Sequence, residues 1–230
     1  TICDMSVFDH PEWFKQSFVY QNKLILPNIV KTAKRIFTIS EFSKSRIIKH
    51  LDVRKDKITV FPCGVSKTFS PKSALSIRGI KEKYNLPSNY ILFLSTIDPR
   101  KNLKNLLKAW GELKKDKEFK FSLVIAGSKG KVFADQNLKN IIKILPDIIF
   151  TGHFEDQDLP YLYSGADCFI YPSFYEGFGL PPLEAMACGT AVVVSKSASL
   201  PEVVGDSAIL IDPYSIKSIL NGIKAIIDNN

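Results

Sequence analysis

Two glutamates, Glu176 and Glu184, lie on either side of a short glycine-containing segment in the C-terminal half of the chain. Gly177 and Gly179 in this segment precede a stretch whose prolines, at 181–182, are typical of the first turn of a helix. The free N–H groups at a helix start can bind an anion, and glycines allow that anion to approach closely. The spacing therefore indicates a diphosphate site, although a glycine-rich turn that only joins a strand to a helix has the same pattern.

The two carboxylates are expected to have different roles. A carboxylate repels a diphosphate, and Glu176 gains little structurally at a strand end, so we expect it to accept hydrogen bonds from sugar hydroxyl groups. Glu184 is predicted to lie in the first turn of the following helix, where a negative charge stabilises the helix by about 0.3–1 kcal/mol through its dipole. A purely structural role for Glu184 is therefore an alternative to ligand binding.

Arg100 and Lys101 are consecutive cations at the predicted start of another helix. Positive charge is unfavourable there, because the N-terminal end of the helix dipole is itself positive. Two cations at this end indicate charge compensation for a bound diphosphate, with ordinary surface charge as the alternative. If they neutralise the diphosphate, no divalent metal is required.

Six short apolar runs recur from residue 90 onward, and each is continuous rather than alternating in polarity. This pattern is typical of parallel strands that are buried on both faces of a sheet. Predicted helices separate the runs, which indicates a doubly wound, Rossmann-like α/β domain over residues 85–230. The runs lie at 91–94, 121–126, 147–150, 168–171, 191–194 and 208–211, and the helices at 102–115, 134–145, 157–165, 180–188, 200–204 and 215–228.

The two most unusual loops follow the first and the fourth of these predicted strands. In an open α/β sheet, ligands bind beyond the carboxyl ends of the strands, at the point where the strand order reverses. For the common order 3-2-1-4-5-6, that point lies between the first and the fourth strand. The loops at 95–102 and 171–185 are therefore expected to face one crevice.

The first 64 residues have a different organisation. We predict a long helix over about 12–34, a strand at 36–40, a helix that begins at Ser40 and a strand at 58–62. This is too little for a doubly wound domain, so residues 1–64 are interpreted as the tail of a preceding α/β domain and residues 65–84 as the linker. Since residue 1 is not Met and the chain stops at the last predicted helix, we expect a piece of a longer protein.

The net charge of +8 is unevenly distributed, because 28 of the 31 Lys and Arg residues precede residue 146. Such a basic stretch can meet nucleic acid, an anionic membrane or a phosphorylated substrate. Few aromatic residues lie among the lysines, which argues against nucleic acid. We favour a solvated surface, with peripheral contact to an anionic membrane as the alternative.

The four cysteines, Cys3, Cys63, Cys168 and Cys188, are far apart and form no CxxC pair. Neither a zinc site nor a disulfide framework is therefore expected. No apolar run approaches the ~18 residues of a membrane span, and the first residues lack the features of a signal peptide. We expect a cytoplasmic chain with reduced thiols, with a peripheral position at the inner face of the membrane as the alternative.

The segment from Glu176 to Glu184 resembles the E-x7-E motif of the large group 1 (family 4) glycosyltransferases, which are retaining enzymes with the two-domain GT-B fold. The opening segment resembles the late first-domain segment of that family, leans toward its mannosyltransferases, and has Cys3-Asp4 where the family often has His-Asp. Supporting matches are TVFPCGV (59–65), PRKNL (99–103), LVIAG (123–127), the region from TGHF to YPS (151–173) and SLPEVVGDSAIL (199–210).

The resemblance implies a role for each position that matches the motifs. Glu176 would face the donor sugar, Glu184 would bind the ribose hydroxyls, and Arg100 and Lys101 would neutralise the diphosphate without metal or other cofactor. Cys3 replaces a His that in the family lies near the donor sugar. The backbone of Gly177, Phe178, Gly179 and Leu180 would meet the phosphates or the sugar, and the backbone near His153 and Phe154 would contact the base.

The residues and the resemblance together predict a glycosyltransferase. It would move a sugar from a nucleoside-diphosphate donor, GDP-mannose or a UDP-sugar, to a glycan or lipid-linked acceptor with retention of configuration, and electrostatic stabilisation of the leaving diphosphate would be the main catalytic effect. Two alternatives stay open, namely a sugar-nucleotide epimerase with the same fold and a nucleotide-sugar-binding chain without transfer activity. Because the acceptor site of this fold lies mostly on the first domain, we expect the 230-residue chain alone to bind a nucleoside diphosphate without transferring sugar.

Overall fold

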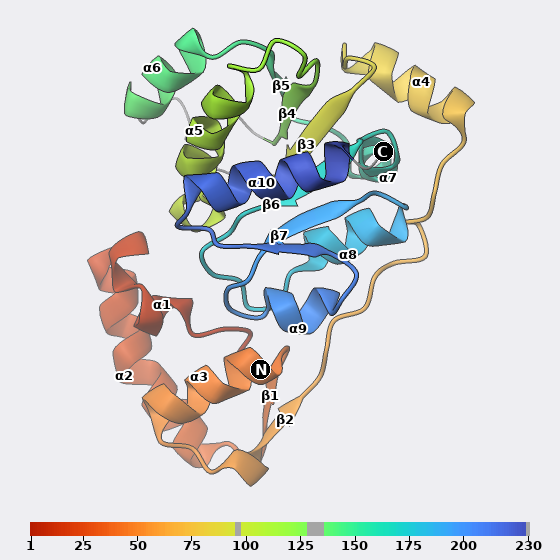
Figure 1. Cartoon of the computed structure of the whole chain (residues 1–230). Coiled ribbons are helices and arrows are strands. Elements are labelled where there is room, and N and C mark those ends of the chain that lie inside the picture. The colour runs from red at the N-terminus through yellow and green to blue at the C-terminus, as the bar shows by residue number, and fades with distance from the viewer. Residues whose placement is uncertain (95–97, 128–135, 229–230) are drawn as a thin grey trace.

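A computed structural model of the chain describes residues 1–94, 98–127 and 136–228, and Figure 1 shows a smaller and a larger unit joined by an extended segment. The smaller unit is built around two parallel strands, in which Ile36 pairs with Ile58 and Thr38 with Val60. Its apolar core includes the fully buried Ile47. Its elements are α1 (Ser6–Asp9), α2 (Gln16–Thr32), β1 (Ile36–Thr38), α3 (Glu41–Leu51) and β2 (Ile58–Val60).

The larger unit is a six-stranded parallel sheet with the strand order β5-β4-β3-β6-β7-β8. Counted from β3, this is the order 3-2-1-4-5-6, so the predicted doubly wound architecture is confirmed. The strands are β3 (Tyr90–Leu94), β4 (Ser122–Ala126), β5 (Ile148–Gly152), β6 (Cys168–Tyr171), β7 (Val192–Ser195) and β8 (Ile209–Ile211). The helices are α4 (Ala74–Lys83), α5 (Leu103–Leu113), α6 (Gln136–Ile144), α7 (Leu159–Ser164), α8 (Leu180–Ala187), α9 (Leu200–Val204) and α10 (Ile216–Ile227).

Helices cover both faces of this sheet, as Figure 1 shows. Ile91 and Phe93 of β3 pack with α5, α6 and α10 on one face, whereas Tyr90 and Leu92 pack with α7, α8 and α9 on the other. Because successive strand residues point to opposite faces, every position is apolar when both faces are covered. The continuous apolar runs of the sequence follow from this arrangement.

Several element boundaries differ from those predicted from the sequence. Within the predicted linker, residues 74–83 form α4, which packs against α7. The helix is largely exposed, so its composition resembles that of a linker. In the smaller unit, α2 begins at Gln16 rather than near residue 12, because a separate 3-10 turn occupies Pro11–Trp13. The strand expected at 36–40 ends at Thr38, and Ser40 caps α3 by accepting a hydrogen bond from the N–H of Ser43 at 3.0 Å.

The cysteines and the helices bear on the predictions about environment. All four cysteines are free thiols, with Cys168 and Cys188 buried. In the part of the chain that the structure describes, no helix has the length and apolar character needed to cross a membrane. The cytoplasmic location and the peripheral membrane contact stay predictions.

Candidate active site

A cavity of about 430 Å³ lies beyond the carboxyl ends of β3, β4, β5 and β6. It is at the reversal of strand order between β3 and β6, where the topology predicted a crevice. Three of the residues singled out from the sequence, Lys101, His153 and Phe154, are among those that line it. The remaining lining residues are Leu94, Ala126, Gly127, Asp156, Leu159, Tyr171 and Pro181.

Lys101 connects this cavity to Glu176. Its ammonium group lies 2.7 Å from Glu176 Oε1, and it also contacts the hydroxyl of Tyr171 at the end of β6. The side chains of Lys101 and Glu176 retain only 15% and 11% of their exposure, so the pair is largely shielded from water. Lys101 was predicted to contact the diphosphate and Glu176 the sugar, and the two side chains contact each other although they are 75 residues apart in sequence.

Arg100 is oriented differently from its neighbour. Its guanidinium pairs with Asp98 at 2.7 Å, and it is not among the cavity-lining residues. Burial favours the neutral form, but the carboxylate of Asp98 outweighs this effect and raises the pKa of Arg100 above its ordinary value. The carbonyl of Arg100 accepts a hydrogen bond from the N–H of Phe174 at 2.8 Å. The two loops predicted to face one crevice are thus joined through their backbones.

Gly177 and Gly179 lie where a larger side chain would clash with neighbouring residues of the protein. Gly179 has a φ of 120°, and a Cβ there would lie 2.6 Å from Leu200 Cδ2, so the position admits neither the conformation nor the volume of a larger residue. A Cβ at Gly177 would lie 2.8 Å from Asp4 Cβ and 3.2 Å from the Cys3 carbonyl oxygen. Gly177 therefore allows close approach of the smaller unit on this side, where we had expected approach of a ligand.

The prediction that Glu184 lies in the first turn of its helix is wrong. The helix begins at Leu180, as predicted, but Glu184 is its fifth residue and so falls in the second turn. The dipole effect fades beyond the first turn, so the structural role considered for Glu184 is weakened. Burial raises the pKa of Glu184, which accepts a hydrogen bond from the Tyr163 hydroxyl at 3.1 Å. Nearer the helix start, Phe178 is buried and Leu180 is 37% exposed.

Residues that hold the glycine segment in place were missed in the sequence. The hydroxyls of Ser40 and Ser43 in the smaller unit donate to the Gly177 carbonyl at 2.7 and 3.1 Å. From the larger unit, Ser199 donates to the Phe178 carbonyl at 2.6 Å. Only the role of Ser40 at the start of α3 was visible in the sequence, because that role depends on local spacing. The other contacts join residues far apart in the chain.

Two acidic residues near the cavity have Asp-x-Asp spacing. Asp156 lines the cavity, whereas the carboxylate of Asp158 accepts hydrogen bonds from Lys83 at 2.7 Å and from Tyr84 at 2.6 Å. Among the described residues, no group of three or more His, Cys, Asp or Glu side chains could hold a metal ion. Whether the site works without metal stays a prediction.

Comparison with known proteins identifies the family. The family model described as "Glycosyl transferases group 1" matches residues 77–230. The chain belongs to this family. The matched range contains the whole six-stranded sheet and the cavity beyond it, so the group 1 glycosyltransferase motifs and the predicted site lie in the same unit.

Individual relatives of this group 1 chain are mannosyltransferases. It is 38% identical over 223 residues to O-antigen chain mannosyltransferase B of Escherichia coli, which covers 95% of this chain and 58% of that protein. It is 32% identical over 237 residues to O-antigen chain mannosyltransferase RfbU of Salmonella typhimurium, covering 98% of this chain and 60% of that protein. The chain thus spans roughly three fifths of the length of these relatives.

Solved structures bear out the fold. Anabaena HepE, solved in complex with UDP-glucose, superimposes with a TM-score of 0.80 at 22% identity and covers 95% of this chain and 60% of that one. The predicted membership of the group 1 glycosyltransferases and the predicted GT-B architecture are confirmed, and the mannosyltransferase relatives agree with the leaning of the opening segment. The roles of the individual site residues are not tested by these comparisons and stay predictions.

Proposed function

We propose that this group 1 chain binds a nucleoside-diphosphate sugar along the cavity beyond β3–β6. The base would lie near His153 and Phe154, the diphosphate near Lys101 and the start of α8, and the sugar near Glu176. The contact between Lys101 and Glu176 carries this proposal, since it joins the expected phosphate and sugar contacts at one end of a cavity that has the expected base contacts at the other. Diphosphate and sugar are adjacent in such a donor.

The protein would transfer the sugar to a glycan or lipid-linked acceptor with retention of configuration. Relatives named as O-antigen mannosyltransferases favour a mannose donor such as GDP-mannose, and the UDP-glucose complex of HepE makes a UDP-sugar the second candidate. A bacterial surface polysaccharide is the acceptor class that these relatives suggest.

Charge stabilisation would be the main catalytic effect. The bond between the anomeric carbon and the diphosphate oxygen breaks, the acceptor oxygen bonds to that carbon from the same face, and its proton passes to the leaving diphosphate. Lys101, the backbone N–H groups of Gly179 and Leu180 and the nearby Arg100 would stabilise the negative charge that develops on the leaving group. Glu176 would orient the sugar by accepting hydrogen bonds from its hydroxyls.

Titration calorimetry with GDP, UDP and the corresponding nucleotide sugars tests the donor site. Glu184→Ala should weaken GDP and GDP-mannose alike, by roughly tenfold to a hundredfold, because a charged hydrogen bond to the ribose is worth about 1.5–3 kcal/mol. Glu176→Ala should weaken mainly the sugar-bearing donor. Glu112→Ala is the matched control, since Glu112 lies on α5 and pairs with the exposed Lys115. Equal losses for both ligands in both site variants would contradict the proposed roles.

A transfer assay on the longer protein separates the classes of activity. Release of free nucleoside diphosphate that depends on acceptor supports glycosyl transfer. Conversion of one nucleotide sugar to another without acceptor would instead identify an epimerase. Binding without either reaction would identify a nucleotide-sugar-binding protein, a candidate that Cys3 keeps in view because the related enzymes often have His there.

A further inference from the structure

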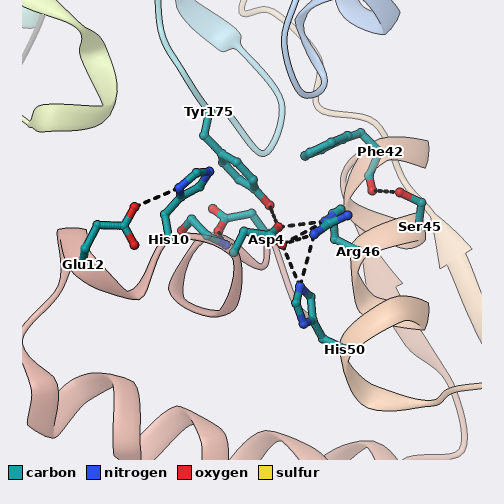
Figure 2. A network of polar contacts seen from close by, with 10 residues as sticks. Asp4, His10, Glu12, Phe42, Ser45, Arg46, His50 and Tyr175 are labelled. Atoms are coloured by element: carbon teal, nitrogen blue, oxygen red, sulfur yellow. Dashed lines mark hydrogen bonds and ion pairs between the residues drawn. The ribbon is translucent and has the colours of Figure 1, made fainter.

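The segment that carries Glu176 is fixed from the smaller unit by a cluster of buried and partly buried polar side chains. Asp9, at the end of α1, retains only 6% exposure of its side chain. Its carboxylate accepts hydrogen bonds from the guanidinium of Arg46, from His50 Nε2 at 2.7 Å and from the Tyr175 hydroxyl at 3.0 Å. Figure 2 shows Tyr175 reaching from the larger unit toward Arg46 and His50 on α3 of the smaller one.

The chemistry of the cluster favours a fixed geometry. Burial alone would raise the pKa of Asp9, but the hydrogen bonds from Arg46, His50 and Tyr175 outweigh it and lower the value to about 2. Burial and the neighbouring Asp9 charge raise the pKa of Tyr175, so its hydroxyl remains a proton donor. An ionised acceptor that binds a neutral hydroxyl and a guanidinium makes strong, directional contacts. Tyr175 is held in one position.

Tyr175 is the residue directly before Glu176, and its ring is enclosed as well as its hydroxyl. Phe42 and Trp13 pack edge-on against the ring, with centroid distances of 5.3 and 6.5 Å. On the other side of Glu176, the Gly177 carbonyl is held by hydroxyls from α3 and its N-cap, as described above. The backbone of Glu176 is therefore fixed before and after by side chains from a different unit.

We propose that Asp9 and Tyr175 are positioning residues for Glu176, through which the smaller unit sets the contact to the donor sugar. This inference rests on the proposed role of Glu176. The polar groups of both residues are engaged within the cluster, since the Tyr175 hydroxyl donates to Asp9, which also binds Arg46 and His50. Asp9 and Tyr175 line a different cavity, of about 360 Å³, so we assign neither a direct contact with the donor. They act by holding the backbone from which the Glu176 carboxylate projects toward Lys101. The nucleotide contacts, on the opposite part of the cavity, do not depend on this hold.

The test is the ratio of the dissociation constants for GDP-mannose and GDP, measured by calorimetry on the wild type, Tyr175→Phe and Asp9→Asn. If the wild type prefers UDP and its sugars, the same ratio is taken for that pair. Removing the Tyr175 hydroxyl should raise the ratio roughly threefold to tenfold, the value of one hydrogen bond, and leave the affinity for the bare diphosphate unchanged. A general loss of folded structure would lower both affinities together. Asp9→Asn should act in the same direction, with a larger fall in melting temperature because Arg46 and His50 lose their partner.

Tyr214→Phe is the matched control. Tyr214 is 68% exposed and packs its ring on Phe174 at 4.8 Å, in the same loop region but outside the Asp9 cluster. It should leave the ratio at the wild-type value. If Glu176→Ala changes the ratio from the wild-type value but Tyr175→Phe does not, the positioning role alone would be overturned. No binding of any nucleotide sugar by the wild type would overturn the proposed function and this inference with it.

Discussion

The pair formed by Lys101 and Glu176 leads to a test of the site that needs no ligand. Their charged atoms are 2.7 Å apart, and both side chains are nearly nine-tenths shielded. Removing one partner of such a pair leaves an uncompensated charge and costs about 3–5 kcal/mol of folding free energy, whereas removing both leaves none. We expect Lys101→Met and Glu176→Gln each to lose about 2–4 kcal/mol, with the smaller loss for Gln because it still accepts a hydrogen bond. The double variant should lose no more than the worse single one.

Urea unfolding of the four proteins at neutral pH gives the interaction energy of this double-mutant cycle. We expect at least about 2 kcal/mol, since the double variant should recover no less than the smaller of the two single losses, and this lies outside the roughly 0.5 kcal/mol within which independent sites add. The same cycle on Arg78 and Glu82, an exposed pair on α4 at 3.0 Å, is the control and should give about 0.3–0.5 kcal/mol. Additive losses at Lys101 and Glu176 would refute the reasoning, because they would mean that each charge is stabilised by other groups or by water.

Three further predictions concern metal, pH and packing. GDP binding should persist in excess chelator, since Lys101 supplies the compensating charge; loss that magnesium or manganese restores would contradict this. Burial raises the pKa of Glu184. If the ionised form of Glu184 binds the ribose, as proposed, GDP affinity should fall as the pH is lowered, beginning above the ordinary glutamate pKa of about 4.3, and Glu184→Gln should abolish that step in a calorimetric pH series. Gly222→Ala on α10 should destabilise by about 1–3 kcal/mol in urea unfolding, because its Cβ would lie 2.4 Å from Ile211 Cγ2, whereas Gly79→Ala on exposed α4, with no atom within 4 Å, should stabilise by about 0.5–1 kcal/mol; equal effects would contradict the packing of α10.

The sheet was predictable because its signals are local or periodic. Continuous apolar runs identified the strands, and a topological rule placed the site beyond β3 and β6. The same rule brought the loops of Lys101 and Glu176 to one edge, although the contact between the two side chains could not be read from it. Strand order fixes which loops are neighbours, while side-chain pairing depends on the conformation of each loop.

Two expectations at the site differ from the structure, for different reasons. Glu184 was assigned to the first turn although the predicted helix start at residue 180 agrees with the structure; counted from Leu180, Glu184 is the fifth residue and lies in the second turn. The space beside Gly177 was assigned to a ligand because nothing in the sequence shows that Asp4, 173 residues earlier, packs there. Non-local packing decided the second case only.

The smaller unit makes direct hydrogen bonds to the segment that follows Glu176, at the proposed sugar end of the site. Three hydroxyls, from Ser40, Ser43 and Ser199, converge on the carbonyls of Gly177 and Phe178, and two of the three belong to the smaller unit. Misplacement of a reacting group by about an ångström is enough to lower a reaction rate a hundredfold, so these contacts would matter if Glu176 orients the donor as proposed. A rotation of the smaller unit that opened the space between the units would have to break them or carry the loop along. If Glu176 has the proposed role, opening of the units would also release the donor sugar, whereas the proposed nucleotide contacts at His153 and Phe154, which lie wholly in the larger unit, would remain in place.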